Sequence, residues 1–386
     1  MRETTPIGMD NEVTQPSRSS TNSKSRASAI RAALVGTVVE YYDFGIYGYM
    51  ATFVAALFFT SEDSNAALLG TFATFAVAFF LRAPGGIFFG HLGDKYGRKN
   101  ALSWTILLMV FATALMGVIP TYATLGIWAT VALVLARCLQ GFAAGGELGG
   151  ATVYTAETAP ARWRATYTAT VVSGMYIGSL VASLTALTLT AIYTDEQILA
   201  WAWRVPFLIS VVLGITGFWI RRSMNDSPQF EQIEKKGETV GLPIIAVLRT
   251  SGSTVLKVAL LGAVTTGGFY TASVYAVTYL KTVGGHSSTI AFLSTSICFA
   301  LGILFLPAFG YMADRWGRKP VILAGSGFAI CLAFPMFILM ANGNPVAAIA
   351  GQLVLFLSVT TVLGAAFSNL GGDVRNLGPL QRPCAG

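Results

Sequence analysis

Two stretches of the sequence decide the fold class. G-H-L-G-D-K-Y-G-R-K occupies residues 90–99, and G-Y-M-A-D-R-W-G-R-K occupies residues 310–319. Both read G-x-x-x-D-[KR]-aromatic-G-R-K, and each follows a long apolar run. A repeat at corresponding positions of two halves is typical of a duplicated transporter fold. The basic residues in both stretches predict loops on one side of a membrane.

The composition around these loops is that of a helical membrane protein. Hydrophobic residues make up 54% of the chain and charged residues only 11%, against about 25% charged in soluble domains. This excludes an ordinary soluble enzyme, a disordered chain and the short alternating strands of a membrane β-barrel. The net charge of +7 is assigned to loops that flank the membrane rather than to nucleic-acid binding. The four cysteines are interpreted as buried apolar side chains.

Uncharged runs of spanning length predict ten transmembrane helices. The predicted spans lie at residues 30–61, 64–81, twice within 101–136, and at 166–194, 205–220, 258–280, 287–313, 321–342 and 344–372. The run 101–136 is divided by Gly117 and Pro120. Most Lys and Arg then fall on the side of the N-terminus, which predicts that this side is cytoplasmic.

The spans predict five segments along the chain. They are a disordered polar tail without the apolar region of a signal peptide (1–29), a six-span bundle (30–222), a cytoplasmic linker (223–254), four further spans (255–367) and a tail (368–386). The last tail carries charges and prolines and so cannot span. The second half ends about two spans short of the first, so we expect a truncated or frame-shifted C-terminus after about Phe367.

Further motifs, taken with the twin loops, resemble the metabolite:H⁺ symporter family of the major facilitator superfamily. They are G-T-V-V-E-Y-Y-D-F (36–44), R-A-P-G-G (82–86), R-C-L-Q-G (137–141), G-G-E-L-G-G (145–150), E-T-A-P-A-R-W-R (157–164) and W-R-V-P-F (203–207). Tyr41 stands where the family usually has tryptophan. The resemblance implies an all-α membrane protein with two bundles and inverted repeats, with ten of the usual twelve transmembrane helices present. It also implies an inner (plasma) membrane location, and we expect a monomer.

Two carboxylates in the first span are candidates for proton coupling. Glu40 and Asp43 are three residues apart and therefore share a helix face. A charge in the bilayer core faces a cavity or a partner, and Arg137 in the fourth span is the candidate partner. Desolvation favours a protonated carboxyl and a nearby arginine favours the ionised form, so the two effects together can let it bind and release a proton. We interpret Asp43 as the proton carrier, Arg137 as its partner and Glu40 as assisting, as the resemblance also implies; the alternative is a permanent ion pair that fixes helix packing.

Arg82 is a candidate for binding an anionic substrate, because a guanidinium matches the geometry of a carboxylate. The alternative is that its side chain snorkels towards the nearby loop. Four aromatic residues are candidates for lining the substrate cavity, with packing as their alternative role. They are Tyr41, Tyr47, Tyr270 and Tyr275.

The twin loops, together with the loop after the fourth span, are predicted to form a cytoplasmic gate. Its residues are Gly90, Asp94, Gly97, Arg98, Lys99, Glu157, Arg164, Asp314, Arg318 and Lys319. The glycines would let the loop turn tightly, and Asp94 could hold a helix N-terminus or pair with a basic residue. By resemblance these residues latch the cytoplasmic side, and the alternative is a simple positively charged anchor.

A glycine-rich stretch after the fourth span is assigned to close helix packing. Its residues are Gly145, Gly146, Glu147, Gly149 and Gly150. For Glu147 two roles stay open, a part in proton transfer or a cap on the glycine-rich packing.

These interpretations predict a secondary active transporter that moves a small polar metabolite with H⁺ by alternating access. The expected cargo is an organic acid such as a di- or tricarboxylate or a shikimate-like acid. A symporter of zwitterions such as proline or betaine and a non-transporting truncated relative remain the alternatives. Neither H-E-x-x-H nor G-x-S-x-G occurs in the sequence, so an enzyme is not expected. The predicted partners are substrate, protons and the lipid bilayer, with no nucleic acid, cofactor or metal.

Overall fold

The structure is a computed structural model that describes residues 18–59, 63–96, 98–147, 155, 159, 161–222 and 244–376. Within these ranges it leaves out the side chains of 18–33, 94, 98–99, 161, 244–251, 254, 258 and 367–376. Every regular element in the described ranges is helical, which confirms the all-α prediction.

The helices fall into two halves along the chain. The first half contains α1 (Arg18–Tyr49), α2 (Ala51–Phe58), α3 (Ser64–Tyr96), α4 (Arg98–Val118), α5 (Tyr122–Leu125), α6 (Ile127–Ala143), η1 (Ala144–Gly146), η2 (Ala161–Trp163), α8 (Arg164–Ile192), α9 (Asp195–Gln197), η3 (Ile198–Ala202) and α10 (Arg204–Arg222). The second half contains α12 (Ile244–Tyr270), η4 (Thr271–Tyr275), α13 (Ala276–Thr282), α14 (Ser288–Trp316), α15 (Arg318–Ala341) and α16 (Pro345–Asn376).

The helices match the predicted spans in number and kind. Nine segments of the described chain are long and apolar enough to cross a membrane, and α1 accounts for the tenth predicted span. The run 101–136 is broken as expected, since α4 ends at Val118 and α6 begins at Ile127. Several helices continue past the apolar runs into polar sequence. α1 already begins at Arg18, α12 at Ile244, and α16 extends to Asn376.

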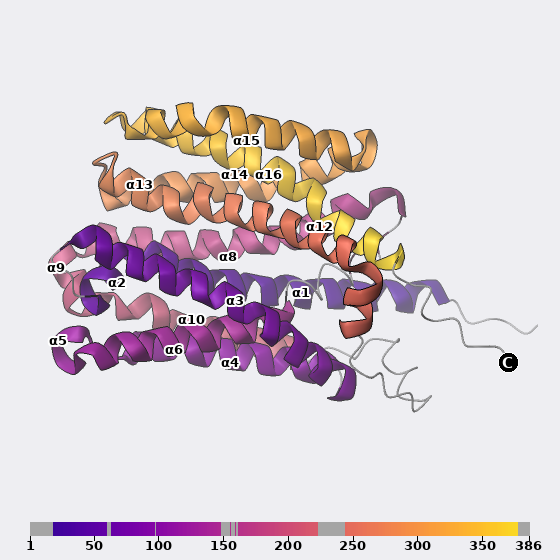
Figure 1. Ribbon diagram of the computed structural model, residues 1–386, viewed down its shortest axis with the longest axis horizontal. Coiled ribbons are helices and arrows are strands. Elements are labelled where there is room, and N and C mark those ends of the chain that lie inside the picture. The colour runs from indigo at the N-terminus through magenta and orange to yellow at the C-terminus, as the bar shows by residue number, and fades with distance from the viewer. Residues whose placement is uncertain are drawn as a thin grey trace, which may run out of the picture.

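The two halves form two groups of helices that lie side by side (Figure 1). α8 of the first group packs along α14 of the second. A glycine permits this contact, because a Cβ atom on Gly310 would lie 2.8 Å from the Cβ of Ala169 and 2.9 Å from the carbonyl oxygen of Ala165. We call the two groups the N-terminal bundle and the C-terminal bundle.

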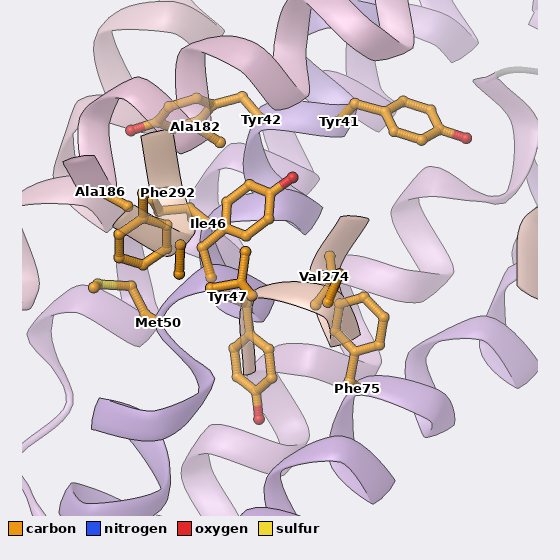
Figure 2. Packing of buried hydrophobic residues seen from close by; sticks show 14 of the residues in the cluster. Tyr41, Tyr42, Ile46, Tyr47, Met50, Phe75, Ala182, Ala186, Val274 and Phe292 are labelled. Atoms are coloured by element: carbon orange, nitrogen blue, oxygen red, sulfur yellow. The ribbon is translucent and has the colours of Figure 1, made fainter. Parts of the chain in front are cut away.

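Aromatic side chains fill the middle of the contact between the bundles. The ring of Tyr176 stacks on Phe269 with centroids 5.8 Å apart, and its hydroxyl group lies 2.9 Å from Oγ1 of Thr360. Figure 2 shows the same buried cluster around α1, with residues contributed by both bundles. Among those labelled are Tyr47, Phe75, Ala182, Val274 and Phe292. The core of the protein is therefore continuous across the two halves.

The two ends of the molecule differ in charge. The junctions of α3 with α4 and of α14 with α15, which carry the repeated loops, lie at the same end, and we call this the basic end. The other end, which we call the opposite end, carries α2, α5, α9 and α13 (Figure 1). α1 runs from the basic end towards the opposite end, so its residue numbers measure depth in the bundle.

Candidate functional site

The interior of the N-terminal bundle holds an ion pair between α1 and α3. Oε1 of Glu40 lies 2.9 Å from Nη1 of Arg82, and the Glu40 side chain is fully buried while 19% of the Arg82 side chain is exposed. The Arg82 guanidinium also lies over the ring of Phe44, 4.2 Å from its centroid, and 5.1 Å from that of Phe79. Arg82 therefore points inward to Glu40, and the snorkelling alternative is wrong.

Arg137 of α6 is buried in an aromatic box. Its guanidinium carbon lies 4.1 Å from the ring centroid of Tyr47, 4.8 Å from that of Phe44 and 4.9 Å from that of Phe75. Such contacts stabilise a cation without neutralising its charge. Its Nη1 donates to the side-chain oxygen of Gln140, one helical turn further along α6.

Gln140 connects Arg137 to α1 and α4. Its Nε2 donates to the backbone oxygen of Asp43 at 3.2 Å and to Oγ1 of Thr113 at 2.6 Å. The amide thus has partners on three helices, and it fixes the position of Arg137 relative to Asp43. Gln140 was not among the residues predicted from the sequence. The available signal was its position three residues after Arg137, which places both on one helix face.

Asp43 is fully buried at the centre of this arrangement. The Thr113 hydroxyl and the Arg137 guanidinium lie close enough to act on it electrostatically. Neither of its carboxylate oxygens has a hydrogen-bond partner of good geometry in the described part of the chain. A buried carboxylate in this condition is costly to keep ionised, so the site favours binding of a proton or a further cationic or hydrogen-bonding group.

Arg137 therefore lies near Asp43, its predicted partner, without binding to it directly. The two residues lie in one buried cluster, but no ion pair joins them among the side chains that the structure describes. Gln140 takes the guanidinium hydrogen bond instead. The arginine bound directly to a first-span carboxylate is Arg82, and its partner is Glu40.

The four predicted cavity tyrosines occupy different places. Tyr270 reaches from the C-terminal bundle to this cluster, since its ring contacts Phe75 and Phe79 and it interacts electrostatically with Arg82. Its hydroxyl group is buried and has no hydrogen-bond partner in the described chain. Tyr41 is likewise buried next to Arg82. These two remain candidates for contacting a substrate.

Tyr47 and Tyr275 have other surroundings. The Tyr47 ring forms one wall of the Arg137 box, and its hydroxyl donates to the backbone oxygen of Thr71 at 3.3 Å. Tyr275 is 45% exposed and packs against Phe337 at a centroid distance of 6.2 Å. Packing, the alternative considered for these tyrosines, describes both of them better than contact with a substrate.

Glycines bring α3 and α6 into close contact behind the cluster. A Cβ atom on Gly141 would overlap the carbonyl oxygen of Ala78, and one on Gly145 would overlap that of Arg82. Gly146 is less tightly placed, because its Cβ would meet Phe89 at an ordinary 3.4 Å. Gly145 therefore has the packing environment expected of it. Gly149 and Gly150 lie outside the described residues.

At the basic end, Asp314 of α14 holds the first turn of α8. Its carboxylate oxygens accept the backbone N–H groups of Ala165 and Thr166 at 2.9 and 2.8 Å, and the Thr166 hydroxyl at 2.7 Å. A carboxylate at a helix N-terminus also benefits from the helix dipole. Next to it, the rings of Trp163 and Tyr311 stack with centroids 5.4 Å apart. We call this contact between the bundles the Asp314 clasp.

The remaining predicted gate residues are only partly defined. Gly97 and Glu157 lie outside the described residues, as do the side chains of Asp94, Arg98 and Lys99. Arg164 begins α8, and Arg318 and Lys319 begin α15.

The glycines of the two repeated loops do not behave alike. Gly317 has a φ of +93° at the α14–α15 turn, a conformation that favours glycine. Gly90 lies inside α3, and a Cβ there would meet nothing within 4 Å. The tight turn predicted for Gly90 is therefore wrong.

At the opposite end, Lys281 bridges the bundles. Nζ of Lys281 in α13 donates to Oγ1 of Thr52 in α2 at 2.8 Å and lies 4.7 Å from the ring centroid of Phe53. This contact involves one hydrogen bond, in contrast to the three of the Asp314 clasp. Polar contacts thus join the two bundles at both ends of their interface.

Comparison with known sequences identifies relatives along most of this chain. The profile of the Major Facilitator Superfamily matches residues 33–379. A proline/betaine transporter of Salmonella typhimurium is 35% identical over 353 residues, which cover 89% of this chain and 70% of the relative. The shikimate transporter of Escherichia coli is 37% identical over 319 residues, covering 81% of this chain and 73% of the relative.

Solved structures show the same architecture. The proton:xylose symporter XylE bound to 6-bromo-6-deoxy-D-glucose superimposes with a TM-score of 0.66 at 17% identity, covering 90% of this chain and 82% of that one. A crystal structure of a D-xylose-proton symporter gives a TM-score of 0.66 at 18% identity, covering 94% and 91%. At such low identity the likeness shows the fold alone.

Proposed function

The chain belongs to the Major Facilitator Superfamily, and from this premise we propose that it moves a small polar metabolite together with protons. In this proposal the two bundles rock about a site between them, so that the site opens to one side of the membrane at a time. The protein would lie in the cell's inner membrane with the basic end in the cytoplasm. The distribution of Lys and Arg supports this orientation.

The observation that carries the proposal is the charge cluster of the N-terminal bundle. Two carboxylates, Glu40 and Asp43, and two arginines, Arg82 and Arg137, are gathered in its interior. Ionisable residues inside membrane helices are costly and mark ion or substrate pathways. Asp43 is the proton carrier in this proposal because its carboxylate is buried and without a direct ion pair. Arg137 stabilises its ionised form from nearby, and Glu40 balances Arg82.

The same cluster suggests how proton and substrate are coupled. When Asp43 takes up a proton, the two arginines face only one remaining negative charge, that of Glu40. A substrate carboxylate would restore the balance, and Arg82 has buried nitrogens, Nε and Nη2, that lack hydrogen-bond partners in the described chain. Binding of proton and anion would therefore favour each other. Tyr41 and Tyr270 would contact the substrate, the latter from the C-terminal bundle.

We favour an organic acid as the substrate, such as a di- or tricarboxylate or a shikimate-like acid. The likeness to a shikimate transporter supports this choice. A zwitterion is the second candidate, because relatives at 35% identity are named as proline/betaine transporters. Both classes carry a carboxylate that can face Arg82, and they differ in the cation that the C-terminal bundle would have to accept.

Uptake by proteoliposomes tests the proposal. With a pH gradient imposed, acid outside, we expect accumulation of labelled shikimate, proline or betaine, and loss of that accumulation when a protonophore collapses the gradient. Asp43→Asn should lower accumulation by about 100-fold or more, the lower end of the range for loss of a proton-transferring group. Glu196→Gln, a neutralised exposed carboxylate in α9, is the matched control. Gradient-independent uptake that survives Asp43→Asn would contradict symport, and no uptake of any probe would favour the non-transporting alternative.

A further inference from the structure

A second buried ion pair lies nearer the basic end of the N-terminal bundle. Directly after η1, Oε2 of Glu147 accepts a hydrogen bond from Nη1 of Arg221 in α10 at 2.8 Å, and Oε1 pairs with Nη2 of the same residue. The Thr105 hydroxyl donates to Oε2 at 3.3 Å, and Nη1 also donates to the Leu102 carbonyl at 2.9 Å. Both charged side chains are almost fully buried. Arg221 was missed from the sequence because it ends a span beside Arg222 and looks like an ordinary loop cation.

This pair lies directly against α1. A Cβ atom on Gly36 would overlap Nη2 of Arg221 and Oε1 of Glu147. The absence of a side chain at Gly36 is thus what lets the pair reach the helix that carries the proton site. α1 therefore carries two carboxylates, Glu40 and Asp43, and packs against a third, Glu147, at a different depth of the bundle.

Two of the three carboxylates lie on one face of α1, and the third, Glu147, packs against the same face at Gly36. Residues 36, 40 and 43 are separated by four and three positions, so they share a helix face. From the opposite end towards the basic end, the order is Asp43, Glu40 and then Glu147 at the level of Gly36. Arg221 acts electrostatically on Glu40 as well as on its own partner. One guanidinium thus lies within the range of two carboxylates.

The charges along this face are balanced when every carboxylate is ionised. Arg137, Arg82 and Arg221 stand opposite Asp43, Glu40 and Glu147. One added proton leaves one arginine without a counter-charge wherever the proton sits. A buried ion pair is rarely the most stable way to pack helices, so a purely structural clamp does not explain why a charge pair is kept here.

Resting on the proton symport proposed above, we propose that Glu147 is a third proton-accepting carboxylate, through which the proton leaves the N-terminal bundle at the basic end. The proton dissociates from an Asp43 oxygen, binds Glu40 and then an oxygen of Glu147. At each step the donor regains its negative charge and the acceptor loses its own. Arg221 is a positioning residue that turns from protonated Glu147 towards ionised Glu40, and returns when Glu147 releases the proton. Around Glu147 the participating groups are Arg221 from α10, Thr105 from α4 and Glu40 from α1.

Comparing net uptake with exchange in Glu147→Gln tests this proposal. Net uptake driven by the pH gradient requires proton release on every cycle, whereas exchange of labelled for unlabelled substrate at equal pH does not. We therefore expect Glu147→Gln to lower net uptake by about 100-fold or more and to keep exchange near the wild-type rate. Labelled shikimate, proline and betaine are the probes, and a pH-sensitive dye inside the vesicles follows the protons. Glu147→Asp should restore net uptake because it keeps a carboxylate.

Two further variants keep the test decisive if Glu147→Gln folds poorly. Arg221→Lys keeps the cation but cannot hold both oxygens, so net uptake should reach its half-maximum at a higher internal pH. Gly36→Ala inserts a methyl group into the pair and should reproduce the Glu147→Gln phenotype. Folded Glu147→Gln protein could lose exchange and net uptake equally, or keep its net uptake unchanged. Either result would overturn the proposed role of Glu147 while leaving symport intact. If the wild-type protein shows no gradient-driven uptake, the proposed function and the proposed role of Glu147 are overturned together.

Discussion

Gln140 in α6 and Gln352 in α16 occupy the fourth and tenth spans and make closely similar contacts. Each donates through Nε2 to a backbone oxygen at 3.2 Å, that of Asp43 in one case and that of Ala272 in the other. Each also donates to a threonine, Thr113 at 2.6 Å or Thr295 at 2.8 Å. The two bundles therefore keep one glutamine-centred arrangement in common.

The difference lies in what the glutamine oxygen accepts. In the N-terminal bundle it accepts the Arg137 guanidinium, and in the C-terminal bundle it accepts the Ser294 hydroxyl at 2.5 Å. Among described side chains, no Asp, Glu, Lys or Arg is buried in the C-terminal bundle. Its Asp314 and Lys281 instead lie at the two ends, where the bundles meet. The buried charges of the described residues therefore lie in one bundle, and the other contributes neutral contacts, the Asp314 clasp and the Lys281 contact. The proposed proton coupling would then belong to the N-terminal bundle.

The largest effect is expected from placing a charge in the neutral bundle. Ala272→Asp puts a carboxylate at the position that corresponds to Asp43. The site is fully buried, and no arginine is buried in the described part of this bundle. We expect a loss of stability of about 3 kcal/mol, the cost of an aspartate at the centre of a spanning helix. Thermal unfolding in detergent measures it, with Ala272→Asn as the uncharged control of similar size. Equal Tm values for the two variants would show that the C-terminal interior tolerates charge.

Removing each glutamine should give unequal effects. Gln140→Leu leaves the buried Arg137 without its acceptor, which we expect to cost about 2–3 kcal/mol. Gln352→Leu leaves the neutral hydroxyl groups of Ser294 and Thr295 without their glutamine partner. Thr295 already donates to the Ala291 carbonyl of its own helix at 3.0 Å, so we expect a loss of stability of about 1 kcal/mol. Tm and net uptake are the measurements for both. If Gln352→Leu is the more damaging variant, the assignment of coupling to the N-terminal bundle is wrong.

The smallest effects are expected at the Asp314 clasp and at the Lys281 contact. Asp314→Ala removes three hydrogen bonds from the α8 N-terminus, a loss of about 1 kcal/mol, and should favour opening at the basic end. Ala169, 1% exposed beneath this contact, can be replaced by cysteine in a background without the native cysteines. Alkylation at that site should be faster with Asp314→Ala and unchanged or slower with Lys281→Met. Faster alkylation with Lys281→Met alone would reverse the assignment of the two ends.

Most of the fold could be predicted from the sequence, because the thickness of the bilayer sets the length of a spanning helix. A run of about 20 apolar residues has few alternatives to a spanning helix, so number and kind of helices followed from hydropathy. The two halves could be predicted because the duplicated loops are a repeat that is visible in the sequence itself. Helix ends were less predictable, since a helix can continue into polar sequence, as α1 does towards Arg18.

The candidate site was predictable in its residues but not in its pairs. The cost of burying charge singled out Glu40, Asp43 and Arg137 within apolar runs. Which arginine meets which carboxylate depends on the rotation and separation of helices far apart in the sequence. These are set by contacts such as that of Gly145 with the backbone of Arg82. Only the tertiary structure could therefore pair Glu40 with Arg82 and assign Arg137 to Gln140.

A duplicated bundle of membrane helices with charge inside its first half follows from the amino-acid sequence alone, because burial of charge and length of apolar runs are properties of single segments. How those charges are shared depends on the packing of the helices, which also brings Arg221 and Gln140 to them. An ion pair between helices requires two backbones to approach within a few ångströms, and that distance is a property of the packed bundle rather than of any segment.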